Sequence, residues 1–327
     1  MSNSGFRRVA PAIGLFFLAP FISEYLLGDF PLTKIGYLLI LAPLYGGGAL
    51  LIREVVRRSR KGWPTILVLA FAYAVLEEAF TTQTLFNPNY LKLNLHLLQP
   101  AYIPSLGIGG WWTIFVLTLH TVWSISTSIA LVEACVPERS TTPWLQWPGL
   151  TLDSILFVLA AIASTRFQMK NDPFRATEMQ FVVSGIIVAA AAIVAFLLPA
   201  RPAGTESALA PSPLLPGAIA LIASSIFLIT PPAWAWGAVA IYIALDLIVI
   251  AIVTAMSRRS GWGGSHRLAL AAGAALAYGW HAFIQKPVDG STGPTVWASH
   301  AVCLLIALAV IFFAARRQSR SGAWPAQ

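Results

Sequence analysis

The sequence predicts an all-α protein, a polytopic transmembrane helix bundle of about ten spans that residues 1–327 form as a single integral membrane domain. Three observations predict this fold class. Of the residues, 57% are hydrophobic and only 10% are charged, whereas a soluble domain averages about 25% charged residues. The apolar residues come in runs of about 20, the helix length that crosses a hydrocarbon core of roughly 30 Å. Basic residues gather in short clusters between these runs. Each run must be a helix, because backbone groups in lipid have to pair within their own segment.

The expected spans lie near residues 9–27, 35–52, 64–85, 111–135, 150–167, 179–198, 214–230, 233–256, 267–285 and 295–315. Arg7 and Arg8 precede the first run, which is too long for the core of a signal peptide and has no small-x-small cleavage site after it. We therefore interpret it as a retained span. The seventh and eighth runs are separated by Thr230-Pro231-Pro232, which we interpret as a tight hairpin rather than a kink.

The basic residues predict the orientation of the bundle. If the N-terminus lies inside, 15 of the 21 Lys and Arg residues fall on the cytoplasmic side. These are Arg7, Arg8, Arg53, Arg57, Arg58, Arg60, Lys61, Arg139, Arg201, Arg258, Arg259, Arg267, Arg316, Arg317 and Arg320. The others, on the outer side, are Lys34, Lys92, Arg166, Lys170, Arg175 and Lys286. Cytoplasmic loops of membrane proteins carry such an excess of positive charge, so we predict that both termini are cytoplasmic.

Composition also excludes several classes of function. The formal charge of +8 does not indicate nucleic-acid binding, because the basic residues lie in the clusters that orient helices. Cys135 and Cys303 both lie within apolar runs and form neither a disulfide framework nor a zinc spacing. No phosphate loop, dinucleotide fingerprint or nucleophile elbow is evident, so we expect no nucleotide. Gly46-Gly47-Gly48 indicates close helix packing. The preference for Arg over Lys and the Ala-rich runs favour a bacterial plasma membrane, with the lipid bilayer as the expected partner.

The outer connection 87–110 is too long for a simple hairpin. Within it, leucines alternate with polar residues over 91–97, a pattern that suits an element lying along the membrane interface. A lid and a passive strap both fit such a loop, and Trp111-Trp112 follows it, as is typical of the interface. A second connection ends in Thr177-Glu178-Met179-Gln180, which predicts a capping box at the start of the sixth span.

An ionisable residue within a span costs about 2.5–3.5 kcal/mol at the bilayer centre and is by default a functional candidate. Four such residues have structural explanations. Glu24 is close to the outer end of its span and can reach water. Glu54 lies at helical spacing from Arg57 and Arg58, which predicts a solvated pair at a helix end. Asp153 suits the dipole of a helix start, and Glu133 lies near the inner mouth.

Glu77 and Glu78 are different, because they stand side by side roughly 12–14 Å below the outer boundary of the third span. His120 reaches nearly the same depth in the next span, which runs in the opposite direction, and consecutive antiparallel helices usually pack together. Further Ser and Thr residues follow the glutamate pair along its helix and His120 along the next helix, and Ser124 lies on the same helix face as His120. We therefore expect these side chains to converge in a wet or tightly bonded pocket. Residues 64–135, with the loop 87–110, are the candidate functional core.

Such a pocket suits acid–base chemistry. Two glutamates in a low-dielectric site cannot both ionise cheaply, so one of them can act as acid or base. A neutral imidazole opposite can hold a water or a developing oxyanion, or bind a divalent metal ion. The alternative is a hydrogen-bonded cluster that only fixes the helix packing. Secondary candidates are Asp246 midway along the eighth span and His281 in the ninth, together with Ser124.

A glutamate pair followed by a histidine on the next span resembles the CAAX-protease and bacteriocin-processing (Abi) clan of intramembrane proteases. The pattern of that clan is Glu-Glu-x-x-x-Arg, then Phe-x-x-x-His, then His-x-x-x-Asn/Asp. Glu77-Glu78 and His120 match, but Thr82 stands in place of the Arg and Val116 in place of the Phe. His281 with Gln285 is the nearest approach to the third motif. The resemblance implies peptide hydrolysis by a water that Glu77 or Glu78 activates with the help of His120, and a peptide or membrane protein as substrate.

Two other classes stay open. In a proton- or cation-coupled transporter, Glu77, Glu78, His120 and Asp246 would relay protons or bind the cation. The absence of a convincing inverted repeat in the sequence counts against this class. The third class is a non-catalytic membrane scaffold or receptor.

Overall fold

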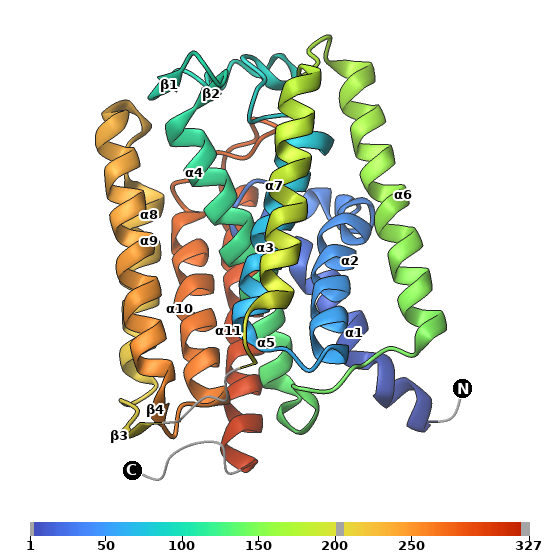
Figure 1. The fold of residues 1–327 in the computed structure, drawn as a ribbon, viewed down its shortest axis with the longest axis vertical. Coiled ribbons are helices and arrows are strands. Elements are labelled where there is room, and N and C mark those ends of the chain that lie inside the picture. Colours follow the sequence, from blue (N-terminus) through green and yellow to red (C-terminus); the bar gives the residue numbers. More distant parts are fainter. Residues whose placement is uncertain (1–2, 201–205, 322–327) are drawn as a thin grey trace.

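The computed structural model describes residues 3–200 and 206–321, which form one bundle of long helices (Figure 1). The long helices are α1 (Asn3–Pro20), α2 (Tyr37–Arg58), α3 (Trp63–Leu76), α4 (Gly110–Leu119), α5 (Ser128–Cys135), α6 (Trp147–Asn171), α7 (Glu178–Leu197), α8 (Leu214–Ile229), α9 (Trp236–Ser257), α10 (Gly264–His281) and α11 (Pro294–Arg320). Three further segments are π-helical: η1 (Phe21–Leu26) continues α1, η3 (Glu77–Thr81) continues α3, and η5 (His120–Thr127) joins α4 to α5. The short elements are η2 (Leu32–Lys34), η4 (Tyr90–Lys92), η6 (Pro137–Arg139), η7 (Pro232–Trp234), an antiparallel pair β1 (Tyr102–Ile103) and β2 (Ile108–Gly109), and a parallel pair β3 (Glu206–Leu209) and β4 (Arg259–Ser260).

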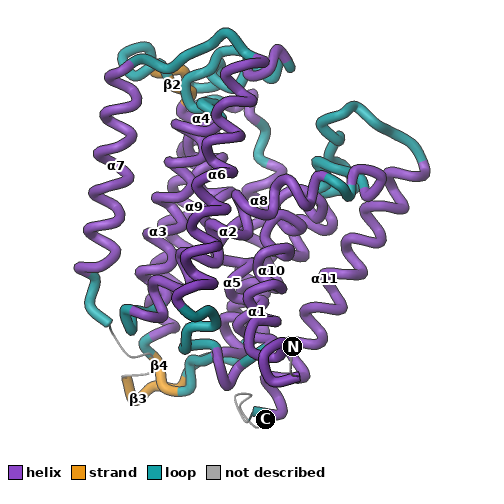
Figure 2. The backbone as a smooth tube through the Cα atoms, turned by 90° about the vertical axis from the view of Figure 1, so that its right-hand side faces the viewer, coloured by secondary structure: helices purple, strands orange, loops and turns teal. Residues whose placement is uncertain are grey.

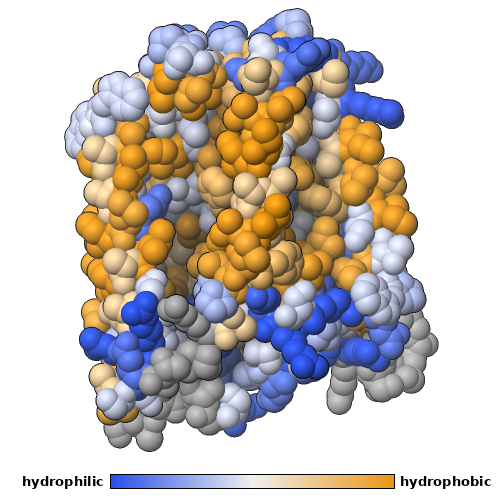
Figure 3. Space-filling view, in the orientation of Figure 1, coloured by the Kyte–Doolittle hydropathy of each residue, from blue (hydrophilic) through white to orange (hydrophobic). Residues whose placement is uncertain are grey.

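The surface of the bundle matches a membrane protein. Among the described residues, eight helices are long and apolar enough to cross a bilayer. On the face shown in Figure 3, apolar residues cover the middle of the molecule and polar residues gather toward its two ends. In each of α6, α7 and α9, only 11% of the most apolar 18-residue stretch is buried inside the bundle. These helices therefore turn their apolar side chains outward. The predicted transmembrane helix bundle is confirmed. The ten-span count stays a prediction, because α8 and α10 do not meet the same criterion.

Both ends of the described chain lie at the same end of the bundle (Figure 1). The segment η6 contacts both of them there. The guanidinium of Arg139 donates to the backbone oxygen of Arg8 over 2.9 Å, and Arg317 lies 3.0 Å from Glu138. We call this the inner end, because it carries most of the described basic residues, and the opposite one the outer end. Arg201, counted above with the inner residues, lies outside the described residues.

A buried ion network closes the inner end of α2 and α5. Arg53 lies 2.7 Å from Glu54 and 3.1 Å from Glu133, and Arg57 donates to both carboxylate oxygens of Glu133 over 2.8 and 2.7 Å. The backbone N–H of Trp144 donates to Glu54 over 2.8 Å. The prediction of a solvated Glu54 was therefore wrong, since its side chain is 0% exposed. The connection that follows η6 folds over this helix end and excludes water from it.

The three consecutive glycines of α2 allow a close approach of helices, as expected. A Cβ on Gly46 would lie 1.9 Å from the backbone oxygen of Phe16 on α1. A Cβ on Gly48 would lie 2.4 Å from the ring of Tyr73 on α3. Any side chain at these positions would push α2 away from its neighbours. The glycines thus bring α1, α2 and α3 together at the level where the polar residues of α3 begin.

The outer connection 87–110 lies across the outer end of the bundle (Figure 2), but it is not the regular element that the leucine alternation suggested. Leu91, Lys92, Asn94, His96 and Ala101 have positive φ, so the side chains do not alternate between two faces. Leu93 and Leu95 are exposed, whereas Leu97 is buried. The other two expectations for loops are confirmed. A capping box of Thr177 and Gln180 opens α7, and a tight turn separates α8 from α9.

Candidate functional site

The three π-helical segments carry the ionisable residues that meet in the outer half of the bundle. Glu24 lies in η1, the glutamate pair in η3, and His120 and Ser124 in η5. Segment η5 packs against both α3 and η1. A π-helical turn holds one residue more than an α-helical turn, is rare, and frequently marks a functional site. Three such segments that meet at one level therefore single out this region.

His120 is the centre of the cluster and is held through both ring nitrogens. Its Nε2 lies 2.9 Å from Oε1 of Glu78, and its Nδ1 lies 3.0 Å from the hydroxyl of Ser124 and 3.4 Å from Oε2 of Glu77. The imidazole ring also packs against the rings of Tyr45 and Tyr73, with centroid distances of 5.9 and 6.4 Å. All three ionisable side chains are at least 95% buried. The predicted convergence of Glu77, Glu78 and His120 is what the structure describes, and Ser124 belongs to it.

Glu78 is fully engaged. While His120 contacts its Oε1, Thr82 donates to Oε2 over 3.2 Å, and the hydroxyl of Thr84 donates to the same oxygen. The indole N–H of Trp112 donates in turn to Thr84 over 3.0 Å. Because Trp112 opens α4, this chain of hydrogen bonds links the outer ends of α3 and α4. The sequence predicted only that the glutamates continue as a polar stripe, and it did not identify Trp112 as part of this chain of hydrogen bonds.

Glu77 is engaged differently. Its backbone oxygen accepts hydrogen bonds from the backbone N–H of Thr82 over 3.0 Å and from the hydroxyl of Thr81. Its side-chain Oε2 is buried and has no hydrogen-bond partner among the described residues. The phenols of Tyr45 and Tyr73 approach this carboxylate without closing a hydrogen bond to Oε2. Glu77 is therefore the carboxylate of the pair that has a free acceptor facing the imidazole.

Glu24 was expected near the outer end of its span with access to water, and the structure adds contacts that this expectation did not include. The side chain is only half-buried, but it lies with Tyr45 in electrostatic range of both Glu77 and His120. The reason is the π-helical turn of η1, which turns Glu24 toward the bundle. A prediction that assumes a regular α-helix could not find this orientation of Glu24, because the sequence of η1 carries no signal for the extra residue in the turn.

The cluster has the composition and spacing of a metal site. Glu77, Glu78 and His120 each offer one ligand atom, and these atoms all lie within 4.8 Å of one another. Imidazole nitrogen and carboxylate oxygen bind zinc at about 2.0–2.2 Å, and three protein ligands leave a position open for water in catalytic zinc sites. The side chains thus fit either a divalent metal ion or direct hydrogen bonding.

Tyr90 of the outer connection lies within electrostatic range of this cluster. Burial raises the pKa of the Tyr90 phenol, and the carboxylates of Glu78, Glu77 and Glu24 raise it further. The base of the connection is held by Asp172, which follows α6. Its carboxylate accepts from the side chain of Asn87 over 2.8 Å and from the backbone N–H of Leu91 over 2.7 Å. Tyr90 is therefore held between two anchored residues, on the side of the cluster that faces the outer end.

The other candidates lie elsewhere. Asp246 accepts a hydrogen bond from Thr118 over 2.9 Å, and Thr118 points away from His120, since two residues of a helix are about 200° apart. His281 is at the end of α10, and Gln285 donates to Asp29 over 2.8 Å, so this pair does not join the cluster. Asp153 is not at a helix start, because α6 begins at Trp147; it is buried, and neither of its carboxylate oxygens has a partner among the described residues.

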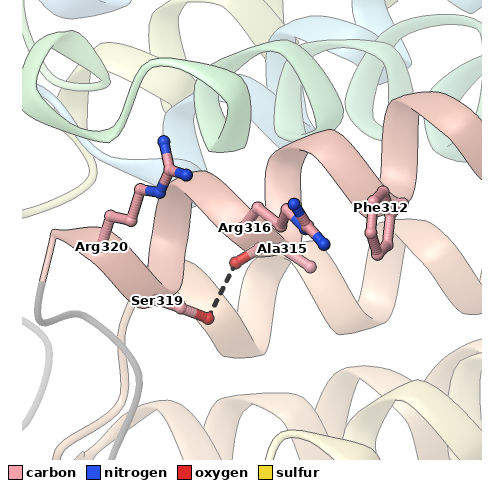
Figure 4. A pocket seen from close by; sticks show the side chains of 5 residues that line it. All are labelled: Phe312, Ala315, Arg316, Ser319 and Arg320. Atoms are coloured by element: carbon pink, nitrogen blue, oxygen red, sulfur yellow. Dashed lines mark hydrogen bonds between the residues drawn. The ribbon is translucent and has the colours of Figure 1, made fainter.

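Two hollows of the bundle lie at the inner end, away from the cluster. One is a shallow depression along α11 (Figure 4), lined by Phe312, Ala315, Arg316, Ser319 and Arg320. Because one helix supplies all five residues, it encloses nothing. The other lies between several helices and is described below.

Comparison with known proteins identifies a family but no function. A model of an uncharacterized membrane protein family matches residues 15–313, which is most of the chain. No curated protein and no solved structure matches. The resemblance to the CAAX-protease and Abi clan has no support from these comparisons.

Proposed function

The chain belongs to this uncharacterized membrane protein family, and we propose that it acts as a membrane-embedded hydrolase in which Glu77 activates a water molecule. One observation carries the proposal. The buried Oε2 of Glu77 has no hydrogen-bond partner among the described residues and lies 3.4 Å from a ring nitrogen of His120. Leaving a buried carboxylate oxygen without a partner costs free energy, and a water that bonds to both groups from the side would remove that cost. Such a water is held by a base on one side and by an imidazole on the other.

The neighbours of this water have distinct roles in the proposal. Glu77 takes the proton as the water oxygen attacks the carbonyl carbon of the substrate. His120 stabilises the oxyanion, and the proton on Glu77 passes to the leaving amine as the C–N bond breaks. Glu78 positions His120, because its two oxygens are held by the imidazole and by two hydroxyls. The resemblance to intramembrane proteases favours a peptide bond of a membrane-embedded polypeptide as the substrate.

A metal ion at the same three side chains would activate the water more strongly, since a zinc-bound water ionises near neutral pH. The donor set of one imidazole and two carboxylates fits such an ion. Measurement of the metal content of the purified chain, before and after treatment with a chelator, separates the two forms of the proposal. Loss of activity together with a stoichiometric ion supports the metal-dependent form.

The proposal is tested with the full chain in nanodiscs and a set of quenched-fluorescent transmembrane peptides. We expect Glu77→Gln to lower the cleavage rate about 10²–10⁴-fold, the usual contribution of a general base. The matched control is Asp246→Asn, which removes a carboxylate from the same bilayer depth but outside the cluster, and should leave the rate unchanged. Equal rates for the wild type and Glu77→Gln, or no cleavage of any peptide by the wild type, would contradict the proposal.

A second function, proton- or cation-coupled transport, is favoured by Glu24. With it, three carboxylates and an imidazole lie within electrostatic range of one another, which is more ionisable groups than hydrolysis requires. Transport predicts dissipation of a pH or cation gradient by the chain in proteoliposomes, and its loss in Glu24→Gln. The hydrolase predicts no flux and an unchanged cleavage rate in that variant.

A further inference from the structure

A cavity of about 170 Å³ lies at the inner end of the bundle, at the far end of α5 from His120. One water needs only about 10–15 Å³ of such space, so the cavity has room for a larger group. It is lined by Trp63, Ala130, Glu133, Ala134, Pro137, Ser140, Gly264, Arg267 and Gln318. These residues come from α3, α5, η6 and the residue that follows it, α10 and α11, so the cavity is a junction of helices rather than a groove on one of them.

Two hydrogen-bond donors in the cavity have no acceptor within the described part of the chain. Arg267 has no carboxylate within 4.0 Å among the described residues, whereas the carboxylate of Glu133, the acidic residue of the lining, is already shared by Arg53 and Arg57. The indole N–H of Trp63 is buried and has no partner in the described part of the chain. A cation and an unsatisfied N–H that line one cavity favour an anionic acceptor.

One acceptor in the cavity has no donor. The side chain of Gln318 is 2% exposed, and its Nε2 donates to the backbone oxygen of Ala134 over 3.1 Å. The free atom must therefore be the carbonyl oxygen Oε1, which has no partner among the described residues. It lies beside Gly264 at the start of α10, where a Cβ would come within 2.3 Å of it. The ligand that satisfies this cavity must carry an N–H or O–H donor as well as an anionic group.

We propose that this cavity binds a phosphate diester that carries a hydrogen-bond donor. The phosphate oxygens accept from Arg267 and Trp63, and the donor of the ligand contacts Oε1 of Gln318. The cavity lies at the basic end of the bundle, and basic pockets between transmembrane helices at a cytoplasmic surface bind lipid head groups. The same chemistry occurs in a lipid head group and in a small soluble phosphodiester. The site is independent of the hydrolase proposed above, because it uses none of its residues.

The test uses thermal unfolding of the full chain in detergent with three probes of matched phosphate chemistry. Phosphatidylethanolamine carries both the phosphate and N–H donors, whereas phosphatidylcholine carries the same phosphate and no N–H. We expect phosphatidylethanolamine to raise the unfolding midpoint and phosphatidylcholine to do so with about tenfold lower apparent affinity or not at all. Glycerophosphoethanolamine is the soluble probe. Stabilisation by this compound as strong as by the lipid assigns the site to a soluble ligand, and stabilisation by the lipid alone assigns it to a head group.

Variants place the binding in the cavity. Trp63→Phe removes only the N–H and keeps an aromatic ring, and Arg267→Gln removes the cation; each should weaken the effect of phosphatidylethanolamine about tenfold or more. Arg316→Gln is the matched control, since it removes an exposed arginine of the shallow depression on α11 at the same end of the bundle. Should Arg267→Gln fail to fold, Trp63→Phe alone decides. Equal effects of the two lipids, or equal losses in Arg316→Gln and the cavity variants, would overturn the proposal.

Discussion

The two adjacent glutamates have the same side chain and the same burial, yet their contacts differ. Glu78 accepts from His120, Thr82 and Thr84, while Oε2 of Glu77 accepts from none of the described residues. A carboxylate that is satisfied on both oxygens orients its neighbours, and one with a free oxygen can still take a proton. Glu78 is therefore a positioning residue, and Glu77 is the candidate base.

The contact between Glu78 and His120 can be measured as a coupling free energy. We expect Glu78→Gln and His120→Ala to be non-additive by more than about 0.5 kcal/mol in a double-mutant cycle, because the two side chains are hydrogen-bonded. The readout is the free energy of unfolding in detergent. The control cycle, Asp246→Asn with His120→Ala, should be additive, since Asp246 bonds Thr118 on the other face of α4. Additivity in the first cycle would mean that the two residues share no site.

The inner ion network allows a prediction on stability. Glu133→Gln leaves the buried guanidiniums of Arg53 and Arg57 without this carboxylate, and breaking a buried ion pair costs about 3–5 kcal/mol. Glu138→Gln breaks the exposed pair with Arg317 at the same end, and such pairs contribute about 0–1 kcal/mol. We therefore expect a large fall of the unfolding midpoint in the first variant and almost none in the second. Similar midpoints for both would contradict the role given to the network.

At the scale of elements, the outer connection 87–110 depends on few anchors. It has little regular structure, and five of its residues other than glycine have positive φ, a conformation that most side chains disfavour. What holds its first part is the carboxylate of Asp172, which accepts from Asn87, Leu91 and, over 2.9 Å, the backbone N–H of Phe174. A segment whose backbone is strained and whose first part is held by one carboxylate is suited to opening in that part.

Asp172→Asn is expected to release this segment. The variant removes the negative charge from three hydrogen bonds, so amide hydrogen exchange over residues 87–98 should become about tenfold faster or more. Asp289→Asn is the matched control, because Asp289 is exposed in another outer loop, and exchange over 87–98 should not change in it. Unchanged exchange in Asp172→Asn would show that the carboxylate is not the anchor.

The same anchor predicts a pH dependence. Burial raises the pKa of Asp172, but the hydrogen bonds from Phe174, Asn87 and Leu91 outweigh it and hold the pKa below its usual value. A lowered pKa means that the stabilisation is complete above the unfolded value, near 3.9, and is lost as the pH falls through the folded value. We expect the difference in unfolding midpoint between the wild type and Asp172→Asn to be constant from about pH 5 to 8. It should shrink only below about pH 4.

At the scale of the whole molecule, helix length alone leaves the topology open. Eight described helices meet the criterion for crossing a bilayer, and α8 and α10 do not. Ten spans place the turn between α8 and α9 outside, whereas eight spans, without α8 and α10, place it inside. Both alternatives put the end of α11 inside. The side of one turn therefore decides the count.

Cysteine labelling tests the ten-span prediction. In a variant with Cys135 and Cys303 replaced by alanine, we expect Trp234→Cys to react with a membrane-impermeant thiol reagent on intact cells, since the large exposed side chain of Trp234 lies in this turn. Asn171→Cys, at the outer end of α6, is the positive control, and Ser319→Cys, at the inner end of α11, is the negative one. Labelling of Trp234→Cys only after the cells are opened would contradict the ten-span topology.

Much of this architecture follows from the sequence, because a bilayer imposes one helix length and one charge bias. The pairing of the glutamates with His120 was also predictable, since depth and helical face can be counted along a regular helix. Glu24 could not be placed in this way, because a π-helical turn shifts the face and has no sequence signature in η1. The burial of Glu54 was missed for a different reason. It depends on a connection, with Trp144 at its centre, that packs back over the helix ends, and sequence periodicity does not describe connections.

The extra residue in η3 also has a consequence for comparing members of the family. Each residue advances an α-helix by about 100°, so a relative with one residue fewer between Leu76 and Thr82 would keep its outer loop in place and lose the alignment of the two carboxylates with His120. Alignment programs would treat that difference as a one-residue gap inside a helix, which is usually dismissed as an error. In this family such gaps at η1, η3 or η5 would mark the members in which the cluster has been dismantled, even where every polar residue is retained.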